Sequence, residues 1–282
     1  MPPKQIILTL LIMLCPIGMA AQSTITRNKP KPAVTKPKPA AKPKAKPAPR
    51  RNSSATGLSA ELNKLINNMV YVSGGTFIMG GDESSDQTPT HSVTLSSYYI
   101  CKYEVTQALW RAVMGSNPSK FKGDNLPVEQ VSWNDCQTFI NRLNSYTGRN
   151  FRLPTEAEWE FAARGGNYSR RYKYSGSNYI GDVAWYTDNS GNRTHPVGTK
   201  QANELGLYDM SGNVWEWCSD WYGSYSSYSQ NDPTGPNSGS DRVIRGGCWS
   251  FPARGCRSFI RFHITPGGHS YYIGLRLVLS QL

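Results

Sequence analysis

Carboxylates, a thiol and tryptophans lie close together in residues 206–223, which read GLYDMSGNVWEWCSDWYG. The acidic residues of this segment are Asp209, Glu216 and Asp220, and Gly212 lies between the first two. Carboxylate and carbonyl oxygens are the ligands that Ca²⁺ prefers, and glycine lets a loop bend until several of them face one point. The spacing therefore suggests a calcium loop. Buried acids beside tryptophan can equally be held by backbone N–H groups or by arginine.

Cysteines are the second group of residues that could carry chemistry. Cys101 lies in a strand pattern and Cys136 on the apolar face of a helix pattern, so both are expected to be small buried hydrophobes. Cys218, Cys248 and Cys256 remain as disulfide partners, which an exported protein can keep oxidised. Two of their thiolates could instead bind Cu(I), a soft metal ion.

Other common catalytic motifs are missing from the sequence. The four histidines are scattered and lack the H-x-x-x-H or H-E-x-x-H spacing of zinc sites. The sequence contains no G-x-S-x-G motif, Walker loop or dinucleotide fingerprint. The tyrosine-rich segment 222–230, YGSYSSYSQ, is either a sugar- or peptide-binding surface or an ordinary polar loop.

The elements that must position these residues are short and separated by long Gly-, Pro- and Asn-containing spacers, which predicts an α+β domain. Two helices have clear N-terminal capping signals, Ser132 with Asp135 and Thr155 with Glu158. Apolar periodicity predicts helices over 106–115, 132–148 and 154–166, a hairpin over 69–81, and strands within 91–106, 242–247, 257–262 and 272–279.

The N-terminal part of the chain has a different composition. Residues 1–21 have a lysine, a short apolar run and small residues before a cleavage point, which predicts a signal peptide. Residues 22–67 are predicted to be a basic, disordered linker rich in Pro, Lys and Ala, and residues 68–282 the folded domain. From residue 52 onward 20 bases face 19 acids, so nearly all of the +12 net charge lies in the tail. The basic charge therefore gives little support to nucleic-acid binding, and no later run is apolar enough for a membrane helix.

Six blocks in the body occur in a familiar order: GGTFIMG, YYICKYEVTQALW, PVEQVSWNDC, FRLPTEAEWEFAARGG, GLYDMSGNVWEWCSDWY and RVIRGG…CRS…GLRLV. Together they resemble the formylglycine-generating enzyme, or sulfatase-modifying factor, domain over about residues 68–280. The resemblance implies an α+β, C-type-lectin-like fold with little regular secondary structure.

The resemblance also implies site residues. The family's calcium ligands fall on Asp209, Gly212, Val214 and Glu216, where two side chains and two carbonyls would bind the ion. The family's Cu(I) is held by two cysteines five positions apart after a G-G-S block. Aligned on that block, the second ligand falls on Cys256, the first on Phe251, and the family serine on Cys248.

Because phenylalanine cannot bind copper, we expect a structural or binding role. The predicted signal peptide indicates an exported, periplasmic or envelope-associated protein. Its partner would be a protein or peptide, and its basic tail could contact envelope polymers. Cys256 would then pair with Cys218 or Cys248 in a disulfide, or stay buried. The alternative is a divergent oxidase that forms formylglycine on a sulfatase cysteine with Cu(I) and O₂, using Cys248 and Cys256.

Overall fold

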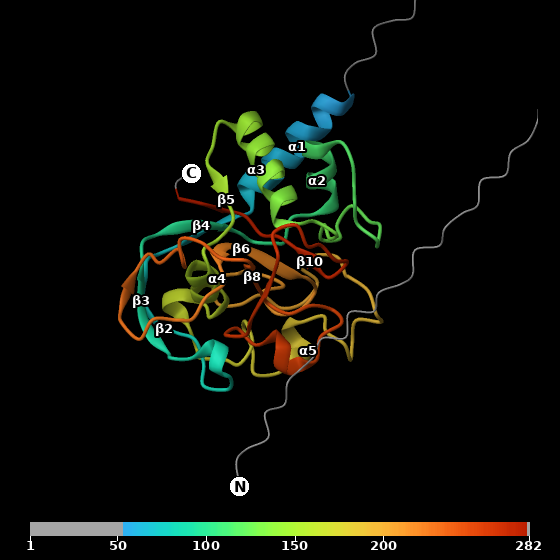
Figure 1. The fold of residues 1–282 in the computed structure, drawn as a ribbon. Coiled ribbons are helices and arrows are strands. Elements are labelled where there is room, and N and C mark those ends of the chain that lie inside the picture. Colours follow the sequence, from blue (N-terminus) through green and yellow to red (C-terminus); the bar gives the residue numbers. More distant parts are fainter. Residues whose placement is uncertain (1–52, 281–282) are drawn as a thin grey trace, which may run out of the picture. The chain divides into compact units, whose positions relative to one another are not determined.

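A computed structural model describes residues 53–280 of the chain as an α+β domain (Figure 1). The predicted signal peptide and residues 22–52 of the predicted linker lie outside the described residues. The helices are α1 Ser53–Asn67, α2 Gln107–Met114, α3 Trp133–Thr147, α4 Glu156–Ala163 and α5 Ile180–Val183, with 3₁₀ turns η1 Ser85–Gln87, η2 Gly166–Tyr168 and η3 Ala253–Cys256. The strands are β1 Met69–Val72, β2 Gly75–Met79, β3 His91–Leu95, β4 Tyr98–Cys101, β5 Phe151–Arg152, β6 Trp215–Trp221, β7 Gln230–Asn231, β8 Arg242–Arg245, β9 Arg261–Ile264, β10 Ile273–Gly274 and β11 Val278–Leu279.

The strands form three small sheets, with orders β1-β4-β11-β5, β10-β6-β8-β9 and β2-β3-β7. The first sheet joins both ends of the domain, because β1 and β11 both pair antiparallel with β4. In the second sheet β6 pairs antiparallel with β8 and parallel with β10. This sheet carries the tryptophan-rich segment on its central strand β6.

The helix predictions from capping are confirmed. Ser132 and Asp135 form a reciprocal capping box at the start of α3, and Thr155 and Glu158 form one at the start of α4. The predicted inner face of α3, which includes Cys136, is buried in the main hydrophobic core. Figure 1 shows α1, α2 and α3 packed together at one end of the domain, beyond the sheets.

The predicted hairpin over residues 69–81 is wrong, because its two strands belong to different sheets. β1 pairs with β4, whereas β2 pairs with β3. Gly74 lies between them, and a Cβ there would come within 2.4 Å of the Leu95 carbonyl oxygen. The glycine thus permits a close crossing of backbones rather than a two-strand turn.

The linker ends earlier than the sequence prediction placed it. Residues 53–67 form α1, which packs on α2. Leu65 is buried in the main core, and Leu58, Leu62 and Ile66 pack against it. These apolar residues recur every three or four positions, so they share one helix face. None of the helices within residues 53–280 is long and apolar enough to cross a membrane.

Candidate functional site

Glu216, a predicted calcium ligand, lies in a buried ion pair. Its carboxylate accepts hydrogen bonds from Arg276, with Oε1–Nη2 at 2.7 Å and Oε2–Nε at 2.9 Å. Trp159 Nε1 donates to Oε2 at 2.7 Å. All three side chains are fully buried. Both carboxylate oxygens of Glu216 therefore already accept hydrogen bonds. This buried acid is held by an arginine, which is one of the alternatives to calcium that the sequence left open.

Asp209 is the other predicted side-chain ligand, and only one of its two carboxylate oxygens has a hydrogen-bond partner. Its Oδ2 accepts from the Gly198 N–H at 2.7 Å, while its Oδ1 is buried without a hydrogen-bond partner among the described residues. Burial raises the pKa of Asp209 to about 6, against the opposing effects of that hydrogen bond and of Arg276. The loop bends sharply here, since Asp209 and Gly212 have φ of 58° and 81°. An unpartnered buried carboxylate oxygen on such a loop suits a cation.

Glu104 is a third buried carboxylate that the sequence analysis missed. It follows β4 and accepts hydrogen bonds from Asn213 Nδ2 at 2.6 Å and from the Val214 N–H at 3.1 Å. Burial raises the pKa of Glu104 well above its ordinary value, and the charges of Asp209 and Glu216 raise it further. The available signal was an acid between the apolar residues of the ICKYEVT segment, far from the loop in sequence.

These three carboxylates have Arg276 as the basic group beside them, so the ionised cluster would carry excess negative charge. A divalent cation would offset that excess, and the free oxygen of Asp209 offers it a ligand. Within residues 53–280, no three His, Cys, Asp or Glu side chains gather closely enough to hold a metal by themselves. The predicted set relies on two carbonyls as well, so calcium stays a prediction.

The five cysteines of the described chain are all free and buried. Cys218 lies in a different core cluster from Cys256. The structure therefore agrees with a buried Cys256 rather than with either disulfide. Cys256 packs against Gly247, where a Cβ would come within 2.6 Å of its Sγ. Cys248 Sγ instead lies 3.2 Å from Ser250 Oγ.

Both candidate thiols are poorly disposed to ionise. Burial raises the pKa of Cys248 to about 11, with hydrogen bonds from Ser250 opposing the rise. Burial also raises the pKa of Cys256, and the charge of Cys248 raises it further. Both thiols are therefore protonated near neutral pH in the metal-free protein.

Phe251, on which the family resemblance places the first copper ligand, has a packed ring. The ring meets Trp215 edge-on, with centroids 5.2 Å apart and planes at 86°. It also lies against the small cluster that contains Cys256, and a Cβ on Gly255 would be 2.7 Å from its Cδ1. The space beside Cys256 is therefore filled by an aromatic side chain.

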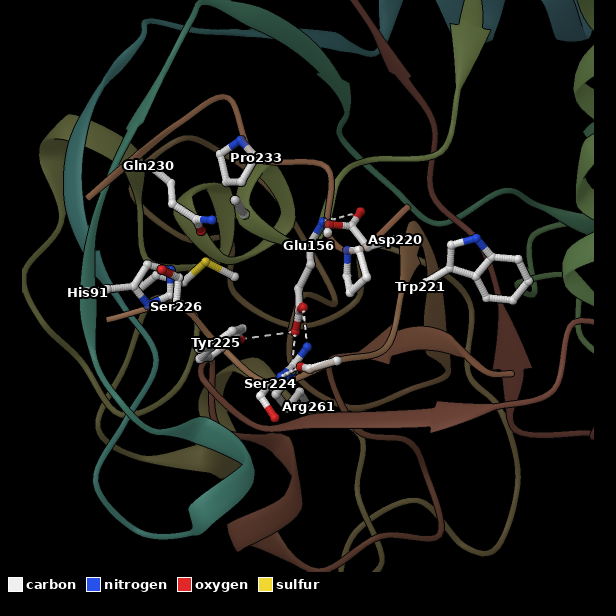
Figure 2. A pocket seen from close by; sticks show the side chains of 15 residues that line it. His91, Glu156, Asp220, Trp221, Ser224, Tyr225, Ser226, Gln230, Pro233 and Arg261 are labelled. Carbon is white, nitrogen blue, oxygen red and sulfur yellow. Dashed lines mark hydrogen bonds and ion pairs between the residues drawn. The ribbon is translucent and has the colours of Figure 1, made fainter. Parts of the chain in front are cut away.

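A separate cavity of about 300 Å³ lies beneath the tyrosine-rich segment (Figure 2). Its wall combines buried polar side chains with aromatic and apolar ones. The lining residues are Met79, His91, Glu156, Ala157, Asp220, Trp221, Gly223, Ser224, Tyr225, Ser226, Gln230, Pro233, Gly235, Pro236 and Arg261.

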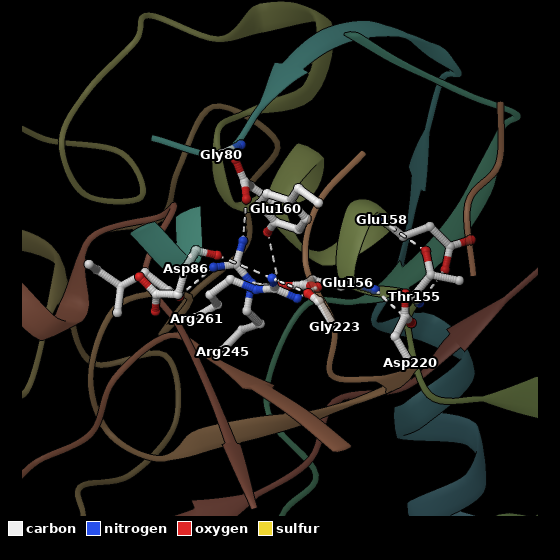
Figure 3. A network of polar contacts seen from close by, with 12 residues as sticks. Gly80, Asp86, Thr155, Glu156, Glu158, Glu160, Asp220, Gly223, Arg245 and Arg261 are labelled. Carbon is white, nitrogen blue, oxygen red and sulfur yellow. Dashed lines mark hydrogen bonds and ion pairs between the residues drawn. The ribbon is translucent and has the colours of Figure 1, made fainter. Parts of the chain in front are cut away.

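A network of buried ion pairs adjoins this cavity through Glu156 and Arg261, which line it (Figure 3). Arg261 donates to both oxygens of Glu156, at 2.8 and 2.6 Å. Glu160 is paired with Arg245 and with Arg164. Such pairs are costly to break, because removing one partner leaves a buried charge.

Comparison with known proteins identifies the family and supports the fold. The family model of the sulfatase-modifying factor enzyme 1-like domain matches residues 55–281. The chain belongs to this family. The solved structures of two related proteins cover 75% of the chain each: Treponema denticola variable protein 1, at TM-score 0.72 and 35% identity, and PvdO from Pseudomonas aeruginosa, at 0.65 and 28%. Each match covers 94% of the other chain, and together they confirm the predicted fold class.

Family relatives carry different names. "Chaperone protein LppX" of Paenibacillus barcinonensis is 39% identical over 231 residues, covering 64% of this chain and 78% of that protein. The formylglycine-generating enzyme of Mus musculus is 32% identical over 248 residues, covering 79% and 64%. A match to serine/threonine-protein kinase pkn1 of Chlamydia caviae, 31% identical, covers 75% of this chain but only 38% of the kinase. Family membership therefore does not fix one activity.

Proposed function

We propose that this family member is an exported, non-catalytic protein with a structural or binding role in the cell envelope. The observation that carries the proposal is the ring of Phe251, which packs on Trp215 and fills the space beside Cys256. Cu(I) in the family is held by two cysteines, and only one of those positions is a cysteine here. The residues present therefore do not fit the family's copper centre.

The surroundings of the remaining thiol support this proposal. Cys256 is fully buried, and burial raises its pKa, so it has little thiolate at neutral pH. A relative named as a chaperone and a match within a kinase are consistent with use of this domain for binding. The partner would be a protein or peptide.

Export and tethering rest on the N-terminal sequence. Residues 1–21 have the pattern of a signal peptide, and the Lys- and Pro-rich stretch that follows suits an extended spacer. Its positive charge would attract anionic envelope polymers. The folded domain would thus be held at a distance from its anchor point.

Calcium is the cofactor that the loop would accept. The predicted ligands are Asp209, the carbonyls of Gly212 and Val214, and Glu216. Asp209 Oδ1 is the side-chain oxygen without a partner, whereas Glu216 would bind the ion while its carboxylate also accepts from Arg276 and Trp159. Support comes from the buried carboxylates of Glu104, Asp209 and Glu216. Burial raises the pKa of Glu104, and the charges of Asp209 and Glu216 raise it further. The bound ion would offset negative charge and stiffen the loop.

A second candidate is a divergent oxidase that uses Cys248 and Cys256. The charge of Cys248 raises the pKa of Cys256, so the two thiols lie within electrostatic range of each other. A Cu(I) ion held by this different pair would keep the family's chemistry. The Cys248 thiol faces the Ser250 hydroxyl, however, which makes this the weaker candidate.

One experiment separates the two. The purified protein is loaded with Cu(I) and given a Cys-x-Pro-x-Arg peptide under O₂, with mouse formylglycine-generating enzyme as the positive control. We expect no thiol-to-aldehyde mass change with this protein. Conversion that is lost in Cys256→Ala and in Cys248→Ala would overturn the non-catalytic proposal and support the oxidase.

A further inference from the structure

The strand β2 lies at the edge of the sheet β2-β3-β7, so within the described part of the chain only one of its sides has a strand partner. On that side β2 pairs antiparallel with β3 over its whole length, from Gly75 with Leu95 to Met79 with His91. An edge strand presents backbone N–H and C=O groups that can pair with another strand. The free side of β2 is therefore a possible site of strand addition.

The hydrogen-bond pattern shows which backbone groups of β2 are free. Residues of an antiparallel pair alternate between those bonded to the partner strand and those pointing away from it. If the even-numbered residues of β2 were bonded to β3, the N–H groups of Gly80 and Ser96 would continue the ladder. Both donate to side-chain carboxylates instead, at 2.9 and 2.7 Å. The N–H and C=O groups of Thr76 and Ile78 therefore point away from β3 and are free within residues 53–280.

Polar side chains close both ends of this free edge. The Gly80 carbonyl accepts from Arg164 Nη2 at 2.7 Å, and the Gly74 carbonyl accepts from Asn167 Nδ2 at 3.0 Å. Between these ends lies a groove of about 580 Å³, lined by β2 and by residues 164–171. The groove therefore follows the stretch of β2 whose backbone groups are free.

The charged side chains of the groove are all cationic. Arg164 and Arg171 line it, and no Asp or Glu does. Arg171 is exposed and takes part in none of the ion pairs within residues 53–280. Arg164 belongs to a network in which three guanidiniums share two carboxylates, those of Arg164, Arg245 and Arg261 against those of Glu156 and Glu160. The groove therefore attracts negative charge.

This charge also decides between possible occupants of the edge. Residues 27–51 of the chain contain ten Lys or Arg and no acid, so the groove repels the chain's own basic segment. A second copy paired through β2 would bring two identical cationic grooves together. An acidic segment of another protein has the complementary charge.

We propose that the free edge of β2 binds an extended, acidic peptide segment of a partner protein as an added strand. Its backbone would bond to Thr76 and Ile78, and its carboxylates would pair with Arg164 and Arg171. Its apolar side chains would cover Ile78, which is 60% exposed. This inference rests on the proposed binding role and specifies its surface and partner. Strand addition and cysteine oxidation are measured separately, so failure of one is distinguishable from failure of the other.

The first test measures peptide binding to the full folded protein by calorimetry. The probes are two end-blocked acidic peptides with alternating apolar residues, TEVEVEVT and TDIDIDIT, and the basic counterpart TKVKVKVT. We expect saturable binding of an acidic peptide, with a Kd at least about tenfold lower than that of the basic one. Failure of both acidic peptides, or equal binding of the basic peptide, would overturn the proposal.

Hydrogen exchange measured by NMR then shows whether the peptide adds as a strand. The N–H groups of Thr76 and Ile78 should exchange rapidly in the free protein and at least about tenfold more slowly with TEVEVEVT bound. The Phe77 N–H, which faces β3, should change little. Slow exchange of Thr76 and Ile78 without peptide would contradict the proposal: if it depends on protein concentration a second copy covers the edge, and if not the chain covers its own edge.

Variants locate the site. Arg171→Glu reverses an exposed charge of the groove and should raise the Kd of TEVEVEVT about fivefold. Arg193→Glu is the matched control, because it changes the net charge equally at an exposed position outside the groove. Ile78→Pro removes a free N–H without removing a bond to β3, and should abolish binding while thermal unfolding shows that the domain stays folded. An unchanged Kd in Arg171→Glu, or one raised equally in Arg193→Glu, would refute the site.

Discussion

Asp220 is expected to make the domain less stable as the pH rises toward neutrality. Burial, followed by the charge of Glu156, raises the pKa of Asp220 from 3.8 to about 7. Between these values the folded state keeps a proton that the unfolded state has lost, so the free energy of unfolding falls as pH increases. The shift corresponds to about 4 kcal/mol at pH values above 7. This is a large part of the 5–15 kcal/mol that stabilises a typical domain.

Asp220→Asn tests this directly, because the amide has the shape of the protonated acid and can still accept from the Glu156 N–H. Urea unfolding of both proteins between pH 4.5 and pH 8 gives their free energies of unfolding. We expect an advantage of about 1 kcal/mol for the variant at pH 4.5, which grows to about 4 kcal/mol at pH 8. Other buried carboxyls titrate in both proteins, so the difference isolates Asp220.

Asp124→Asn is the control for the loss of one carboxylate. The Asp124 side chain is 68% exposed and pairs with Arg111 on the surface, so its stability difference should stay within about 0.5 kcal/mol at every pH. If the difference between the wild type and Asp220→Asn is the same at pH 4.5 as at pH 8, the buried, proton-holding Asp220 inferred from the structure is refuted.

Three further changes test other parts of the fold by thermal and urea unfolding. Leu65→Ala should cost about 2–5 kcal/mol if α1 belongs to the core, whereas a loss below about 0.5 kcal/mol would mean that α1 is dispensable. Gly247→Ala should destabilise by about 1–3 kcal/mol, because φ is 77° and the new Cβ meets Cys256; unchanged stability would contradict that close packing. EDTA should lower the Tm of the wild type but not of Asp209→Ala, and an unaltered wild-type Tm would remove the support for calcium.

Local signals in the sequence predicted local structure well. The capping pairs Ser132–Asp135 and Thr155–Glu158 lie three residues apart, so each helix start could be read from a few positions. Strand pairing depends on segments far apart, and the alternation of residues 69–81 is equally compatible with one hairpin or with two sheets. Only the partners β4 and β3 distinguish these cases, and the sequence does not identify them.

The same limit applies to the sites. The acidic loop was visible because Asp209 and Glu216 are near each other in sequence, but Glu104 joins them from more than 100 residues away. The cavity beside the tyrosine-rich segment likewise combines Arg261 with Glu156 across 105 positions. The sequence predicts a possible binding surface at the Tyr-rich segment, yet the cavity beside it is also lined by residues of β3, β6 and β7. Residues that meet only through tertiary packing leave little trace in local spacing.

The position of Phe251 explains how the fold can persist without the family's pair of cysteines. Its ring replaces a thiol by apolar contacts with Trp215 and Gly255, so the cysteine cluster stays filled. The buried pairs Arg245–Glu160 and Arg276–Glu216 lie on other elements and do not depend on that position. Because breaking those pairs would leave buried charges, they constrain the framework independently of the residue at position 251. Under the proposed non-catalytic role, one side chain removes a copper ligand of the family while these ion pairs keep the framework in place.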